Sequence, residues 1–111
     1  MTDDEMKVEL EEIERLVNDI WDSVLVFRRR GTEFLFAAKE KQVVRARALA
    51  DQLIAEGDSV LDLIKKTSIS DDLAQEFMRV SGMDVRDTSA RLTEEVEGIM
   101  ECVNRWMSAN P

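Results

Sequence analysis

The stretch "VFRRRGTEFLF", residues 26–36, decides how the chain is divided into helices. It places three arginines, a glycine and a threonine between two apolar runs. Arginine stabilises the negative carboxyl end of a helix, glycine is preferred just after that end, and threonine can cap the next helix. We therefore predict that one helix ends at Arg30 and that the chain turns at Gly31 into a second helix beginning at Thr32.

The same stretch also permits a basic ligand site. Seven of the fifteen basic residues lie in or just after it, namely Arg28, Arg29, Arg30, Lys39, Lys41, Arg45 and Arg47. Residues 31–66 hold six acidic and six basic residues, while the segments on either side are acidic, so much of this basic charge can face acids of neighbouring helices. The predicted turn at Gly31, called the corner below, accounts for every residue of the stretch. We therefore prefer it to a ligand site.

The residues before the corner have the pattern of one long amphipathic helix. Thr2 followed by three acids is typical of a capped helix start, because the hydroxyl and the acids both match the positive end of the helix. Apolar residues then recur in alternating steps of four and three at Met6, Leu10, Ile13, Val17, Ile20, Val24 and Phe27. This heptad spacing predicts a helix over about residues 3–30 with coiled-coil-like packing.

Two further helices are expected after the corner. The first covers about residues 32–66 and has a weak point at Gly57, and the second covers 71–109 with a possible bend near Gly82. The short polar residues 67–70 favour a turn between them. We predict an all-α fold, a single domain over 1–111 built as an antiparallel bundle of three long helices, or four if the chain breaks at Gly57 or Gly82.

The expected helix lengths are unequal, which leaves apolar surface uncovered. At ~1.5 Å per residue the helices would span about 42, 52 and 57 Å, so the later two project beyond the first. The projecting tip would present an apolar surface, which we predict to be a protein interface, most simply of a homodimer. Its residues are Val60, Leu61, Ile64, Ile69, Leu73 and Phe77. At the opposite end, Trp106 is expected level with Phe27 and Phe34.

Composition and charge narrow the classes of partner. The chain has 111 residues and a net charge of −9, which repels nucleic-acid phosphates and anionic lipids. No run of apolar residues approaches the ~18 needed for a membrane span, and the start "MTDDEMK" is too acidic for a signal peptide. One cysteine excludes an internal disulfide. We expect a cytoplasmic protein whose partners are proteins.

Residues for familiar catalytic and metal sites are scarce. Histidine is absent, which removes Ser-His and Cys-His nucleophile pairs, His-containing zinc and di-iron sites, and haem ligation by His. Calcium-binding and phosphate-binding loop motifs are also missing. Cys102 lies between apolar residues and is expected to be a small buried group. We predict that the chain is not an enzyme and binds no cofactor or metal.

Two functional hypotheses follow from these patterns. The first is a non-enzymatic protein–protein interaction module, such as an adaptor, a chaperone-like subunit or an inhibitor, that acts through apolar helix faces and self-associates. The second is a nucleic-acid-associated factor that uses the basic residues between Arg28 and Arg47. The net charge of the chain disfavours the second hypothesis.

Overall fold

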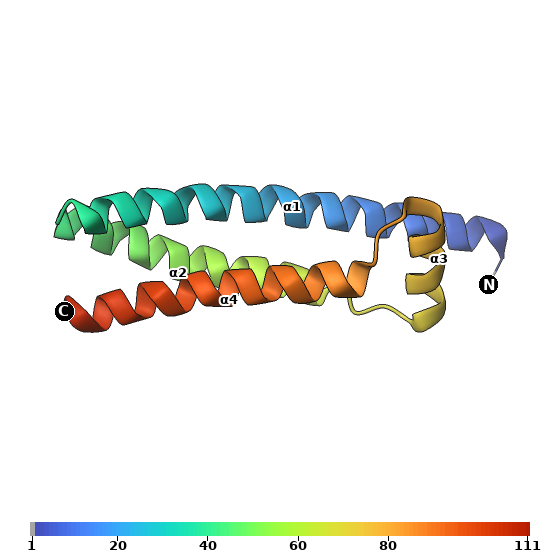
Figure 1. The fold of residues 1–111 in the computed structure, drawn as a ribbon. Coiled ribbons are helices and arrows are strands. Elements are labelled where there is room, and N and C mark those ends of the chain that lie inside the picture. The colour runs from blue at the N-terminus through green and yellow to red at the C-terminus, as the bar shows by residue number, and fades with distance from the viewer. Residues whose placement is uncertain (1) are drawn as a thin grey trace.

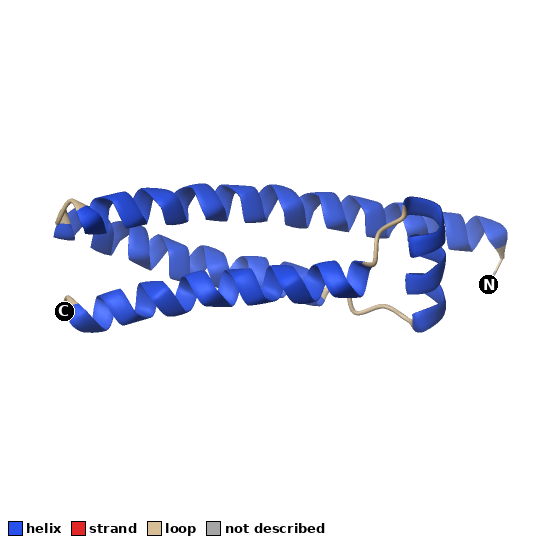
Figure 2. Ribbon diagram, in the orientation of Figure 1, coloured by secondary structure: helices blue, strands red, loops and turns tan. Residues whose placement is uncertain are grey.

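The computed structural model describes residues 2–111, and among these residues it contains helices and no strand. Four helices follow one another, α1 (Asp3–Lys39), α2 (Val43–Lys65), α3 (Asp71–Ser81) and α4 (Val85–Ala109). The molecule is a rod of 57 × 19 × 18 Å (Figures 1 and 2). Helices α1 and α4 run in the same direction, α2 runs against both and packs on each, and α3 crosses the rod at one end. The predicted all-α antiparallel bundle is confirmed.

The heptad pattern of α1 faces the core. Thr2 caps the helix, since its hydroxyl accepts a hydrogen bond from the Glu5 amide at 3.2 Å. The heptad positions from Ile13 to Phe27 are all buried, and these are Ile13, Val17, Ile20, Val24 and Phe27. Ile20, Val24 and Phe27 join the inner faces of α2 and α4 in the main core, whereas Ile13 and Val17 belong to a second cluster. The sequence prediction for this half of α1 is therefore confirmed.

The predicted corner at Gly31 is wrong, because α1 continues through it to Lys39. Gly31 is buried and faces α4, where a Cβ added to it would lie 3.7 Å from Cγ2 of Ile99. The Thr32 hydroxyl does not cap a new helix and instead donates to the Arg28 carbonyl at 3.1 Å. Phe34 and Ala37, which lie three and six residues after Gly31, continue the buried face of α1. Burial of Phe34 stabilises the continued helix by about 2 kcal/mol, which outweighs the ~1 kcal/mol cost of an internal glycine.

The chain reverses at Glu40–Gln42, nine residues later than predicted. The Gln42 amide donates to the Ala37 carbonyl at 2.9 Å, and the Lys41 amide donates to the Ala38 carbonyl at 3.2 Å. This pair of bonds is the Schellman ending of a helix, which places one residue in the left-handed conformation. That residue is Lys41, with φ of 61°. The signal was missed because the position usually belongs to glycine.

Helix α2 begins at Val43 instead of Thr32 and is unbroken at Gly57. Gly57 is buried against α4, and the Met100 side chain fills the space that a Cβ would need. Glycine therefore permits a close approach of the two helices here, and the packing of Met100 compensates for its weak helix propensity.

The expected helix over 71–109 is two helices, as the alternative break at Gly82 allowed. Gly82 has φ of 76°, and its amide donates to the Met78 carbonyl at 2.8 Å, which ends α3. Asp84 then caps α4 by accepting a hydrogen bond from the Asp87 amide at 3.1 Å. A left-handed glycine followed by a capping aspartate is sufficient to stop one helix and start the next.

Candidate interaction surface

The six residues of the predicted tip interface lie in or beside the core of the chain. Val60 and Ile64 belong to the main core, and Leu61 packs partly buried against it. Phe77 is buried in a second cluster with Ile13, Val17 and Val85, and two partly buried residues, Ile69 and Leu73, pack against this cluster.

The length argument behind that tip is wrong because the helix lengths are reversed. Helix α1 has 37 residues and spans about 55 Å, whereas α2 has 23 residues and spans about 35 Å. The overhang is thus the N-terminal part of α1, and α3 folds across it (Figure 1). The hydrophobic surface that the sequence assigned to a partner is covered by the chain itself.

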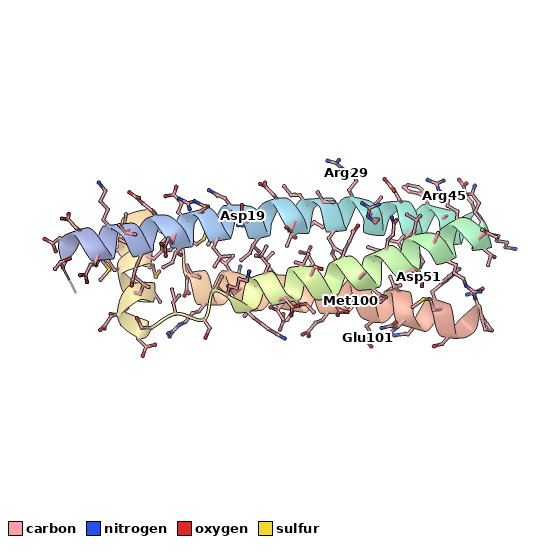
Figure 3. The ribbon with its side chains drawn as sticks, turned by 180° about the vertical axis from the view of Figure 1, so that it is seen from behind. Asp19, Arg29, Arg45, Asp51, Met100 and Glu101 are labelled. Atoms are coloured by element: carbon pink, nitrogen blue, oxygen red, sulfur yellow. The ribbon has the colours of Figure 1, made fainter. Side chains whose placement is uncertain are left out.

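The three arginines of residues 28–30 point in different directions. Arg28 donates to both carboxylate oxygens of Glu95 on α4, each at 2.8 Å, and Arg30 lies 2.7 Å from a carboxylate oxygen of Glu56 on α2. The hydrogen bond to Glu95 raises the pKa of Arg28. Arg29 projects away from the bundle (Figure 3). Two of the three therefore tie α1 to its neighbours, and only Arg29 is available to a ligand.

The other four basic residues lie at the end of the rod where α1 turns into α2. Lys39 and Lys41 form no ion pair with a described residue. Arg45 donates a hydrogen bond to the side-chain oxygen of Gln42 at 3.4 Å and projects from this end in Figure 3. Arg47 donates to the carbonyl of Asn110 near the C-terminus. This end carries cationic groups that the chain does not neutralise.

Four large apolar side chains are exposed beside these cations. Leu35 and Phe36 on α1 are 57% and 60% exposed, and Val43 and Val44 on α2 are 45% and 87% exposed. Buried residues alternate with them, since Phe34 and Ala37 face the core from α1. The name turn surface is used below for seven residues, the apolar Leu35, Phe36, Val43 and Val44 and the basic Lys39, Lys41 and Arg45.

The sequence contained a signal for the turn surface that the corner prediction concealed. Residues 34–38 and 43–44 are consecutive apolar residues on helices, "FLFAA" and "VV". A helix packed on one side buries only one stripe, so some members of such a run must face solvent. Placing the turn at Gly31 put the first run at the start of a helix, so its exposure at the end of α1 was not predicted.

Helix α2 starts without the usual stabilising groups. Thr2, Ser70 and Asp84 cap the other three helices with side-chain hydrogen bonds, whereas Gln42 makes none to the backbone of α2. Its first turn has no acid and carries Arg45, a cation near the positive end of the helix dipole. Residues that break local stability rules in this way are typical of surfaces with a function.

Two shallow grooves run beside the turn surface, between α1 and α4. One has a volume of about 330 Å³ and is bordered by Leu35, Ile99 and Cys102. Cys102 is exposed there, so the prediction that it is buried is wrong. The second, about 250 Å³, lies at the end of the rod between Val43 and Trp106. Trp106 meets Phe34 edge to face at 5.4 Å, which confirms the expected level of this tryptophan.

A third groove lies at the opposite end, between α1 and α3, with a volume of about 530 Å³. Leu10, Phe77 and Val80 supply apolar walls, and Val80 is 61% exposed. Glu11 and Glu14 stand on its α1 side. The name α3 groove is used for it below. It was missed because α3 was expected to continue straight into α4, which would leave nothing crossing α1 at this end.

No cluster of three or more potential metal ligands occurs among the described residues. None of the described helices is long and apolar enough to cross a membrane. Comparison with known proteins gave no match to a family model, a curated protein or a solved structure.

Proposed function

We propose that this chain is a non-enzymatic protein–protein interaction module, an adaptor, chaperone-like subunit or inhibitor, that binds through the turn surface. The observation that carries the proposal is the exposure of Leu35, Phe36, Val43 and Val44 on either side of the turn between α1 and α2. Isolated exposed apolar residues are ordinary on soluble proteins, but four at one end of a rod are typical of a contact site.

The energetics of burial support binding at this surface. A large apolar side chain contributes roughly 1.5 to 3 kcal/mol when it passes from full exposure to full burial. Phe36 and Val44 are mostly exposed and have most of that free energy still to gain from a partner. The aromatic ring of Phe36 and the neighbouring Leu35 would serve as anchors, because large side chains dominate the binding energy of interfaces.

The chemistry of the turn surface favours a partner that is apolar with an acidic border. Lys39, Lys41 and Arg45 surround the apolar residues and have no acidic partner among the described residues. Cations at the border of an apolar patch steer an acidic partner into place and disfavour a basic one. An acidic helix with one apolar face would match these groups.

A photo-crosslinking experiment in the native cell tests the proposal. Phe36 is replaced by benzoyl-phenylalanine, which keeps an aromatic ring at the position, and Asp51, exposed on α2 (Figure 3), is replaced in a matched control. We expect a protein adduct from position 36 that is lost when Leu35→Ser and Val44→Ser are added. Equal adducts from both positions, or none from position 36, would contradict the proposal.

A second candidate, the nucleic-acid-associated factor, is supported by the unneutralised cations of the turn surface. It predicts that a labelled oligonucleotide binds at low salt and that binding weakens steeply as salt rises. The triple change of Lys39, Lys41 and Arg45 to Gln would remove it. The exposed phenylalanine and leucine between those cations favour a protein, and a titration without salt-sensitive binding would eliminate this candidate.

A further inference from the structure

The two ends of the rod carry opposite charge and comparable apolar surface. Residues 3–14, which lead into the α3 groove, contain seven acidic residues and one basic residue. Residues 35–47, which contain the turn surface, hold four basic residues and one acidic residue. Each end therefore has the charge that the other end would attract.

The exposed face of α1 links these two ends. Four exposed residues at spacings of four, three and four border the α3 groove, and these are Lys7, Glu11, Glu14 and Asn18. One heptad after Asn18, the same spacing begins again in a second exposed set formed by Leu25, Arg29, Thr32 and Phe36. Because α1 is a single continuous helix, both sets lie on one stripe along its length.

The two sets are symmetric about a point between Trp21 and Asp22. If a second α1 lies antiparallel on this stripe, Arg29 of one chain is level with Glu14 of the other, and Lys39 is level with Asp4. Phe36 is then level with Lys7, beside the apolar walls of the α3 groove. The same contacts occur twice, since a two-fold axis at that point relates the chains.

We infer that the occupant of this face is a second copy of the chain, bound antiparallel so that each turn surface lies over the α3 groove of its partner. This inference rests on the proposed function and names the partner. Charge complementarity selects the antiparallel arrangement, because a parallel pair would bring acidic end against acidic end. The pairing also covers Phe36 and Leu25, which one chain leaves about half exposed or more.

Charge reversal in two separate chains tests the inference. One variant carries Arg29→Glu and Lys39→Glu, and the other carries Asp4→Lys and Glu14→Lys; all four positions are exposed, so both variants should fold, as circular dichroism can verify. We expect sedimentation to give twice the 12.7 kDa chain mass for the unmodified protein and about tenfold weaker self-association for each variant. An equal mixture of the two variants should associate again, because every reversed pair is then complementary.

Cysteine crosslinking fixes the direction of the two chains. On a Cys102→Ser background, Lys7→Cys and Phe36→Cys proteins are treated with a short bis-maleimide, separately and mixed. The antiparallel pair predicts a crosslinked dimer in the mixture only, since each position is far from its own copy. A parallel pair would instead crosslink each protein with itself.

The outcomes separate this inference from the proposed function. An unmodified protein that is monomeric across micromolar concentrations overturns the second-copy inference, while a position-36 adduct to a different protein would still support the interaction module. Species that grow beyond a dimer with concentration indicate head-to-tail chains and also overturn the closed pair. If neither charge-reversed variant self-associates more weakly than the unmodified protein, the second-copy inference is also overturned.

Discussion

The two ends of the rod differ in whether a helix crosses them. At one end α3 lies across α1, and Phe77 is only 5% exposed against Ile13, Val17 and Val85. At the other end the chain turns directly from α1 into α2, and Phe36 is 60% exposed. Both are phenylalanines on helices. The amphipathic pattern of a helix therefore selects which face is apolar, whereas a crossing element decides whether that face is covered.

The largest expected effect separates these two phenylalanines. Phe77→Ala leaves a cavity in the second core cluster and should lower the free energy of unfolding by about 3 to 5 kcal/mol. At protein concentrations low enough to keep the chain monomeric, Phe36→Ala removes an exposed ring and should change this free energy by no more than about 0.5 kcal/mol. Urea denaturation followed by circular dichroism measures both. Equal losses would mean that Phe36 is packed in the isolated protein and that the turn end is not open.

The next effect contrasts the glycines near the two ends. Gly82→Ala forces a side chain into a left-handed conformation and should destabilise the fold by about 1 kcal/mol. Gly31→Ala should stabilise it by roughly 0.5 to 1 kcal/mol, because position 31 is inside a helix and the added methyl makes an ordinary contact with Ile99. Thermal unfolding compares the pair. Destabilisation by Gly31→Ala would support the predicted helix end at residue 31 and contradict a continuous α1.

A smaller effect tests the position of the true turn. Lys41 is the one described non-glycine residue with positive φ, so Lys41→Gly relieves strain and should stabilise the protein by a few tenths to about 1 kcal/mol. Lys39→Gly, two residues earlier and still in α1, is the matched control and should destabilise by up to about 1 kcal/mol. The two substitutions should therefore change the stability in opposite directions. If both changes destabilise, the Schellman ending is not at residue 41.

The smallest effect concerns the adjacent arginines. Arg28→Gln removes a two-bond ion pair with Glu95 whose side chains are 40% and 35% exposed, so the expected loss is at most about 1 kcal/mol. In the monomeric protein, Arg29→Gln should leave the free energy of unfolding unchanged within about 0.3 kcal/mol, because its side chain is exposed and unpaired among the described residues. Chemical denaturation at low and high salt measures both. A larger loss for Arg29 would assign it a structural role.

The helical content and most of the core could be predicted from spacing alone. Steps of four and three from Ile13 to Phe27 place one face of α1 in the core, and the capping residue Thr2 marks the start of α1 correctly. These are local properties, since a cap or a heptad involves residues within a few turns of each other. The break at Gly82 was also within reach, because a glycine followed two residues later by aspartate is a local stop and start.

The candidate surfaces could not be predicted in the same way. Whether Gly31 ends a helix or lies inside one depends on its packing against Ile99. The same holds for Gly57 and Met100, and each partner is more than forty residues away. Once the corner was placed too early, the overhang was assigned to the wrong helices, and the predicted interface fell on residues that the chain buries wholly or in part. The turn surface and the α3 groove both emerge only when the true helix lengths are known.

Composition and spacing within one element are sufficient to predict the all-α class, the net charge of each segment and the apolar face of the long helices. Only the tertiary structure decided where α1 ends, since packing of Phe34 against Trp106 favours continuing a helix that Gly31 alone would favour ending. Tertiary packing also decided which apolar residues are covered. That outcome depends on α3 folding across one end of the rod and on the lack of a crossing helix at the other among the described residues.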